Sequence, residues 1–479
     1  MDELQEWTFD SVFRATDGCE PVEPDGHLRT RPPFVAPGAR HDLVRRTYPL
    51  GTNGPRRTPH AGGRSLAAHS ARGQISPFTI GGVHTLAEDA ADSSIAAAGR
   101  GGLVRLLWAP SIRSFRSGFE PGVQAARALA ATMVVFVHMF SIGVATPKTQ
   151  FVGYLKWDEF TRFIRLDEQH GAEAGVFLFF LVSGYIVSQV AAVERGATFL
   201  AKRAARLLPA MMLAIGLAVV VGMTLHAIGR ATWYLFNPDH ALTWRSILEA
   251  LGFGAVRSIE VLFPLWTLAV EYYWYFLLFV FMWFCRTRPV LGTLLMQLGL
   301  VLLFWVAPVV SAGSFGLERA WIVPVGVVLI GRWVYLVRCG LGLVPGIAGA
   351  LSAFGMYLAL NSAMLGNVTN ETLISSSLTV IWASAIFCCL LAVLHGPLWG
   401  PVNLMAEISY GMYLYHIPIA WVLLTTFVPT GGPWMLPVVL LSFAATVGFG
   451  LLSHTFVEKP IRNAVRRRLG NRPQPTIVV

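Results

Sequence analysis

The sequence is short of charged residues and of cysteine. Only 13% of its 479 residues are Asp, Glu, Lys or Arg, whereas 54% are hydrophobic, and the mean hydropathy is +0.56. Soluble globular domains carry about 25% charged residues, so this composition excludes an ordinary soluble protein and indicates a membrane protein. Five cysteines in so long a chain form no disulfide framework. This excludes a small secreted scaffold held together by disulfides.

The first 104 residues lack any long apolar run. They are rich in Gly, Pro, Arg, Ala and His, and residues 1–102 hold 11 Arg, no Lys and 12 acidic residues. We predict that residues 1–104 are a disordered tail or a stretch upstream of the true translation start, without a signal peptide. The net charge of +10 therefore belongs to the hydrophobic part. Basic residues beside apolar segments indicate membrane orientation, and we expect no nucleic-acid partner and no metal site.

From about residue 125, apolar stretches of about 18–24 residues alternate with short polar connections. Each stretch is long enough to cross a hydrocarbon core of about 30 Å. Ten such spans lie at about 125–145, 173–193, 207–227, 262–284, 289–310, 320–338, 343–363, 373–394, 409–428 and 434–456. The predicted fold class is an all-α polytopic membrane protein with about ten transmembrane helices.

The distribution of Lys and Arg predicts the orientation. One set of connections carries most of the basic residues, together with the segment after the last span. Because such residues concentrate on the cytoplasmic side, both termini are predicted to be cytoplasmic. The membrane domain is predicted over residues 105–463, and a basic cytoplasmic tail over residues 464–479.

Two ionisable residues share one face of the first span. Arg127 and His138 are eleven residues apart, which is about 20° past three full helical turns and about 16 Å along the axis. A cation at the cytoplasmic mouth suits a phosphate-bearing donor, and a neutral imidazole deeper in the membrane suits a base acting on a hydroxyl. The alternative is that Arg127 reaches lipid headgroups and His138 only satisfies a helix contact.

A basic cluster precedes the third span, and a carboxylate lies in the fourth. Lys202, Arg203 and Arg206 fall on one helical face, which suits a multiply charged phosphate or ordinary membrane anchoring. Glu271 lies in an aromatic stretch where a carboxylate needs a partner or a proton. It has either a functional role or the role of a buried structural partner.

The ninth span carries a polar face. Ser409, Tyr413 and His416 are spaced i, i+4 and i+7, so they share one side of a helix. Pro418 lacks an amide hydrogen and predicts a kink beside His416. This face is either the wall of a cavity or a set of belt residues at the membrane interface.

Together, these segments resemble acyltransferase family 3, the polytopic membrane O-acyltransferases. The first span has the family's Arg-x10-His spacing, and the resemblance covers about residues 122–463. The matching motifs are Gln124-Ala-Ala-Arg127-Ala-Leu-Ala with His138, Gly175-Val-Phe-Leu-Phe-Phe-Leu-Val-Ser183-Gly184-Tyr, Arg203-Ala-Ala-Arg206-Leu-Leu-Pro209, Trp266-Thr-Leu-Ala-Val-Glu271, Ile408-Ser409-Tyr410 with Tyr413-Leu-Tyr-His416-Ile-Pro418, and Phe456-Val-Glu458-Lys459-Pro460.

The resemblance implies the transfer of an acyl group from cytoplasmic acyl-CoA to a hydroxyl. Acetyl is the acyl group that we expect. The acceptor would be a glycan, a lipid-linked sugar or a small molecule, and the protein would sit in the inner or plasma membrane with no permanently bound cofactor. It makes His138 the base on the acceptor side, with Glu271 as a second catalytic residue that positions the acyl group or a histidine. The donor-binding residues that the resemblance implies are Arg127, Lys202, Arg203 and Arg206. The implied acceptor or cavity residues are Ser183, Ser409, Tyr413 and His416.

One position departs from the family pattern. Phe177 stands where the family often has Asp, and Glu173 lies four residues earlier on the same helical face. Direct attack by the acceptor is the simpler mechanism, and a covalent acyl-enzyme on Ser183 or a tyrosine is the alternative. The sequence contains no Gly-x-Ser-x-Gly elbow.

Two other classes of protein suit parts of the pattern. A proton-coupled secondary transporter also places His, Glu and Arg inside its spans, although no internal repeat is visible here. A non-catalytic membrane scaffold or sensor would tolerate replacement of His138. The Arg-x10-His span and the basic connection before the third span favour the acyltransferase.

Overall fold

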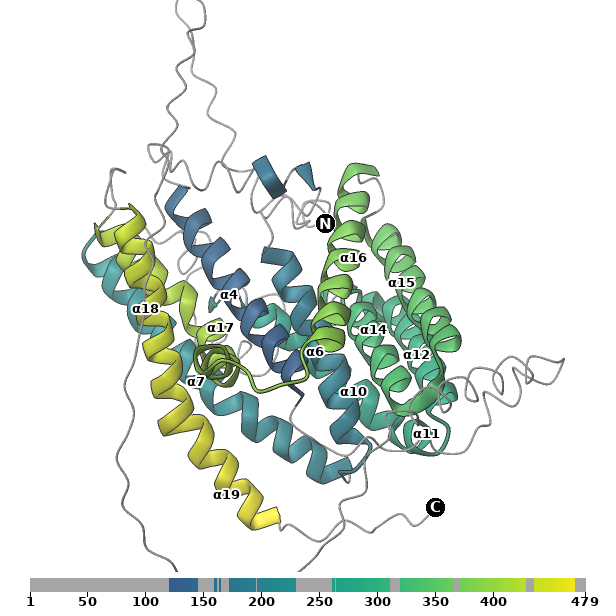
Figure 1. The fold of residues 1–479 in the computed structure, drawn as a ribbon. Coiled ribbons are helices and arrows are strands. Elements are labelled where there is room, and N and C mark those ends of the chain that lie inside the picture. The colour runs from purple at the N-terminus through teal and green to yellow at the C-terminus, as the bar shows by residue number, and fades with distance from the viewer. Residues whose placement is uncertain are drawn as a thin grey trace, which may run out of the picture. The chain divides into compact units, whose positions relative to one another are not determined.

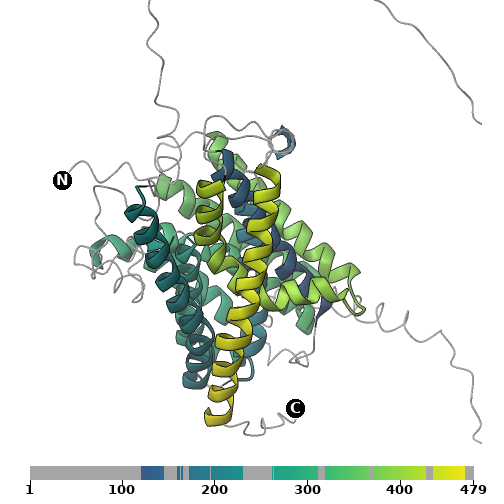
Figure 2. The same cartoon turned by 90° about the vertical axis from the view of Figure 1, so that its left-hand side faces the viewer.

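The computed structural model describes residues 120–144, 159–161, 163–164, 172–194, 196–229, 261–262, 264–310, 319–365, 370–427 and 435–469 (Figures 1 and 2). The predicted disordered segment 1–104 lies outside this part. The described residues form helices and turns and contain no strand. The main helices are α4 (Pro121–Val144), α6 (Ala172–Ala191), α7 (Gly196–Ala227), α10 (Leu265–Val280), α11 (Met282–Thr287), α12 (Pro289–Val310), α14 (Val325–Leu336), α15 (Leu343–Leu365), α16 (Asn370–Val393), α17 (Gly400–Phe427), α18 (Met435–Ser453) and α19 (Lys459–Leu469).

The predicted all-α membrane fold is confirmed. Every one of the ten predicted spans has a helix at its position, and eight helical segments in the described part are long and apolar enough to cross a membrane. The sixth span consists of α13 (Arg319–Ile322), α14 and a turn of π-helix, η1 (Val337–Leu341). The side of the membrane on which the termini lie stays a prediction.

The other two predicted spans are α10 and α17. α10 has 16 residues, because the helix breaks at Phe281 before α11 continues the chain. α17 has 28 residues but carries tyrosines, serine, histidine and glutamate along its length, so it is not among the eight apolar segments. It bends between its two ends and has Pro418 inside it (Figure 1). A helix with several polar side chains along its length therefore lies where a cavity wall is predicted.

Helices α4 and α6 form the centre of the described bundle. α4 packs against α6, α16, α17 and α18, whereas α6 also packs against α14 and α10. α18 continues through a second π-helical turn, η2 (His454–Glu458), into α19, and the two form one path beside α7 (Figures 1 and 2). α19 covers residues 464–469, the start of the segment predicted as a tail.

Two glycines let α6 and α14 approach each other closely. A Cβ atom on Gly184 would meet the carbonyl oxygen of Val328, and one on Gly331 would meet that of Leu181. Helices inside membranes commonly associate through such small residues, because their backbones can then make close van der Waals contact. This contact holds the side of α6 opposite the pocket described below.

Candidate functional site

The two polar faces predicted on α4 and α17 lie against each other. The guanidinium of Arg127 donates a hydrogen bond to Ser409 Oγ at 3.0 Å. Farther along the same two helices, His138 Nδ1 lies 2.9 Å from His416 Nε2. Because both pairs follow the same order along their chains, α4 and α17 run in the same direction at this contact.

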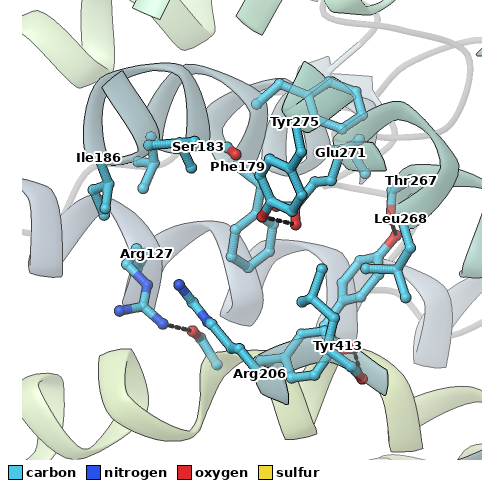
Figure 3. A pocket seen from close by; sticks show the side chains of 17 residues that line it. Arg127, Phe179, Ser183, Ile186, Arg206, Thr267, Leu268, Glu271, Tyr275 and Tyr413 are labelled. Atoms are coloured by element: carbon cyan, nitrogen blue, oxygen red, sulfur yellow. Dashed lines mark hydrogen bonds between the residues drawn. The ribbon is translucent and has the colours of Figure 1, made fainter. Parts of the chain in front are cut away.

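A pocket opens between α4, α6, α7, α10 and α17. Its empty volume is about 690 Å³, including open solvent at its mouth. Arg127 and Arg206 point into one end, which we call the basic end, and Thr267, Leu268 and Tyr413 line the opposite end, the Tyr413 end (Figure 3). Its remaining walls come from Val176, Phe179, Phe180, Val182, Ser183, Ile186, Val187, Leu207, Glu271, Tyr275, Ser409 and Tyr410.

The basic end brings two cations from different helices together. Arg127 donates to Ser409 and, at 3.4 Å, to Gln124 Oε1, and both of these acceptors are neutral. Arg206 comes from α7, which is held to α17 by a hydrogen bond from the Tyr410 hydroxyl to the Leu207 carbonyl. Two guanidinium groups beside neutral acceptors make a site suited to a phosphate, whose oxygens accept several hydrogen bonds.

The carboxylate of Glu271 lies in the same pocket. The Tyr275 hydroxyl, one helical turn away, donates to Glu271 Oε2 at 2.7 Å. Glu271 also lies near enough to Arg127 to interact with it electrostatically. The structure therefore groups Glu271 with Tyr275 and the basic end.

The Tyr413 end is held by a chain of hydrogen bonds. The Thr267 hydroxyl donates to the Tyr413 hydroxyl at 2.9 Å, and Tyr413 donates to the carbonyl of Pro264 at 3.5 Å. The Phe179 ring packs edge-on against the Tyr413 ring, with centroids 5.6 Å apart. These contacts fix the tyrosine between the pocket and the histidine pair.

The histidine pair lies just beyond this end of the pocket. The His416 ring is 5.8 Å from the Tyr413 ring, centroid to centroid, and its side chain is fully buried. His138 is half-buried, and neither histidine is among the residues that line the pocket. Tyr413 therefore stands between this end of the pocket and the histidine pair.

Ser183 presents a buried hydroxyl to the pocket. Its side chain is 7% exposed, and its Oγ has no hydrogen-bond partner in the described part of the chain. A buried polar group without a partner is destabilising. A ligand in the pocket would supply that partner.

The other two cations of the predicted cluster lie outside the pocket lining. Lys202 forms an ion pair with Glu194 at 2.7 Å. The Arg203 guanidinium lies over the Phe199 ring, 5.9 Å from its centroid. Of the three predicted phosphate-binding residues on α7, only Arg206 reaches the pocket.

Four contributors to the site were not singled out from the sequence. Tyr275 and Thr267 lie one turn on either side of Glu271. Helical spacing from Glu271 is the signal that could have identified them. Arg462 on α19 lies close enough to Arg127 and Arg206 to interact with both, and Glu458 lies among these charges. Arg462 follows Pro460 at a predicted helix boundary. The sequence there did not distinguish Arg462 from a basic residue that only anchors a helix at the membrane surface.

The position that departs from the family pattern faces away from the pocket. Phe177 is 2% exposed and packs edge-on against Tyr357, with ring centroids 6.0 Å apart. Neither Phe177 nor Glu173 lines the pocket. The described residues also contain no group of His, Cys, Asp or Glu arranged to hold a metal ion.

These features define a polytopic helical membrane protein with a basic pocket and, beyond its Tyr413 end, a pair of histidines. Residues 120–454 match the profile of the family described as acyltransferase domain. The match covers most of the 479-residue chain, and the chain belongs to acyltransferase family 3. Comparison with curated proteins and with solved structures finds no match.

Proposed function

We propose that this membrane acyltransferase transfers an acyl group, acetyl in the simplest case, from cytoplasmic acyl-CoA to a hydroxyl. The acceptor belongs to a glycan, a lipid-linked sugar or a small molecule, and the protein resides in the inner or plasma membrane. The observation that carries this proposal is the pocket whose basic end holds Arg127 and Arg206 and whose other end adjoins His138 and His416. A phosphate-bearing thioester and a base are the two requirements of the reaction.

The basic end binds the phosphates of CoA in this proposal. Arg127 and Arg206 supply the charge-assisted hydrogen bonds, and Arg462 adds positive potential near them. Glu271, with Tyr275, lines the path of the donor. The apolar walls from Val176, Phe180 and Leu268 suit the uncharged arm of the donor.

The dimensions of the donor fit this arrangement. The arm between the phosphate and the sulfur of CoA contains about a dozen bonds, equivalent to about four extended residues or roughly 14 Å. Arg127 and His138 are eleven residues apart on one helix, or about 16 Å along its axis. A phosphate held at Arg127 therefore leaves the thioester within reach of His138.

His138 acts as the general base in the transfer step. It takes the proton of the acceptor hydroxyl as the oxygen forms a bond to the acyl carbon, a role that typically contributes about 10²–10⁴-fold to the rate. The bond from carbon to sulfur then breaks, and the electron pair leaves with the thiolate. The proton on His138 passes to that thiolate and restores the neutral base.

Binding measurements with fragments of the donor test the proposal without knowledge of the acceptor. Purified protein in nanodiscs of uncharged lipid is titrated with acetyl-CoA, 3′-dephospho acetyl-CoA and S-acetylpantetheine. We expect affinity to fall in that order, and the affinity for acetyl-CoA to fall with added salt, because phosphate contacts supply the binding.

Two outcomes would contradict this account. Equal affinity for acetyl-CoA and S-acetylpantetheine would show that the arginines do not bind phosphate. No binding of acetyl-CoA by folded protein would remove the donor and favour a transport function for the same pocket.

A further inference from the structure

The pair of histidines is linked to a backbone carbonyl. His416 Nδ1 lies 2.6 Å from the carbonyl oxygen of Tyr413, and His416 Nε2 lies 2.9 Å from His138 Nδ1. The two rings are nearly parallel, with an interplanar angle of 15° and centroids 5.1 Å apart. Carbonyl, His416 and His138 thus form one hydrogen-bonded series across α17 and α4.

This series determines where the protons lie. A carbonyl oxygen can only accept, so the hydrogen between Tyr413 and His416 is on Nδ1 of His416. A neutral imidazole carries one hydrogen, so Nε2 of His416 holds a lone pair and accepts. The hydrogen between the rings is therefore on Nδ1 of His138, and His138 Nε2 becomes the nitrogen able to take up a proton.

We propose that His416 is a positioning residue that holds His138 in the tautomer needed for general base catalysis. This inference rests on the proposed function and adds a role for His416 beyond that of a cavity wall. The second ring nitrogen of a histidine is commonly fixed by a hydrogen bond in this way, which sets both tautomer and ring orientation. Here the fixing group is a second histidine, itself fixed by the Tyr413 carbonyl.

The same hydrogen bond stabilises the charged state formed during transfer. When His138 Nε2 takes the proton of the acceptor hydroxyl, the ring becomes an imidazolium with hydrogens on both nitrogens. Its Nδ1 hydrogen stays bonded to the lone pair on His416 Nε2. This hydrogen bond strengthens as the His138 ring becomes charged. The proton on Nε2 then goes to the departing thiolate, so protons and electron pairs balance without another reactant.

Two substitutions of His416 separate this role from packing. His416→Gln retains a carbonyl oxygen near the position of Nε2, and its amide can donate towards Tyr413. His416→Leu fills the space with an apolar group that accepts no hydrogen bond. Activity is followed by chromatography as the release of CoA from acetyl-CoA, with water as the acceptor.

We expect His416→Leu to lower kcat by about 10²–10⁴-fold while the affinity for acetyl-CoA stays within about twofold. His416→Gln should stay within about tenfold of the wild type. A purely structural role predicts a different pattern, in which both variants lose activity in proportion to their loss of thermal stability. Equal activity of folded His416→Leu and the wild type would overturn the proposal.

The tautomer itself is read from the ¹⁵N spectrum of histidine-labelled protein, with the His138 signals assigned by their loss in His138→Gln. We expect His138 to be protonated at Nδ1 in the wild type and at Nε2 in His416→Leu. A wild-type spectrum with His138 protonated at Nε2 overturns the inference, whatever the activity. If the wild type binds but never consumes acetyl-CoA, the proposed function fails, and the spectrum still decides the hydrogen-bond arrangement separately.

Discussion

Replacing Arg127 by Gln tests the basic end of the pocket. The substitution removes the charge but keeps a group that can hydrogen-bond to Ser409, which the native side chain contacts at 3.0 Å. A hydrogen bond to a charged group contributes about 1.5–3 kcal/mol net. Since about 1.4 kcal/mol corresponds to a tenfold change in affinity, we expect the Kd for acetyl-CoA to rise by about 10- to 150-fold.

The assay is calorimetric titration of acetyl-CoA into protein in nanodiscs of uncharged lipid. Arg467→Gln serves as the matched control, because Arg467 is an exposed cation on α19 and does not line the pocket. It removes the same charge and should leave the Kd within about twofold. Thermal unfolding of each variant confirms that the protein remains folded.

The two arginines of the basic end should also be coupled. Arg127 and Arg206 line the same end of one pocket, and neighbouring residues that share a ligand have interaction energies of about 0.5–3 kcal/mol. The double variant should therefore lose less affinity than the two single losses predict. An unchanged Kd in folded Arg127→Gln would refute the assignment of phosphate binding to this end of the pocket.

Three further predictions concern packing, long-range charge and the buried hydroxyl. Gly331→Ala should destabilise the protein by about 1–3 kcal/mol in thermal unfolding, because its Cβ would meet the Leu181 carbonyl. Gly355→Ala should leave the stability unchanged, because its Cβ would meet no atom within 4 Å. Equal destabilisation by the two substitutions would contradict the account of the contact between α6 and α14. Arg462→Gln should weaken acetyl-CoA binding by a few-fold at low salt and not at high salt, and a salt-independent loss would indicate direct contact. Ser183→Ala should weaken binding by about 2- to 10-fold and leave turnover measurable, whereas complete loss of turnover would favour an acyl-enzyme.

Helical periodicity predicted the faces of the site. The spacing of Arg127 and His138 placed both on one side of the first span, and the spacing of Ser409 and His416 did the same for the ninth. These relations depend only on residues within one helix, and the structure has both faces in contact. The apolar lengths likewise predicted the positions of the helices at the ten spans, because the hydrocarbon core sets those lengths.

The partners across helices were not predictable. Nothing in the sequence indicated that His138 would meet His416 rather than Glu271, because that depends on which helices are neighbours. For the same reason, the pattern on α7 did not show that Lys202 pairs with Glu194 while Arg206 reaches the pocket. Cations that share one helical face can therefore have different surroundings once other helices pack against that face.

Turnover of acetyl-CoA by a His138→Gln variant tests the central claim most directly. The control is His395→Gln, since His395 is exposed and bonds only to a neighbouring carbonyl in the described part of the chain. With equal binding of acetyl-CoA, we predict that His138→Gln loses about 10²–10⁴-fold in CoA release while His395→Gln is unchanged. Wild-type turnover in folded His138→Gln would contradict the account.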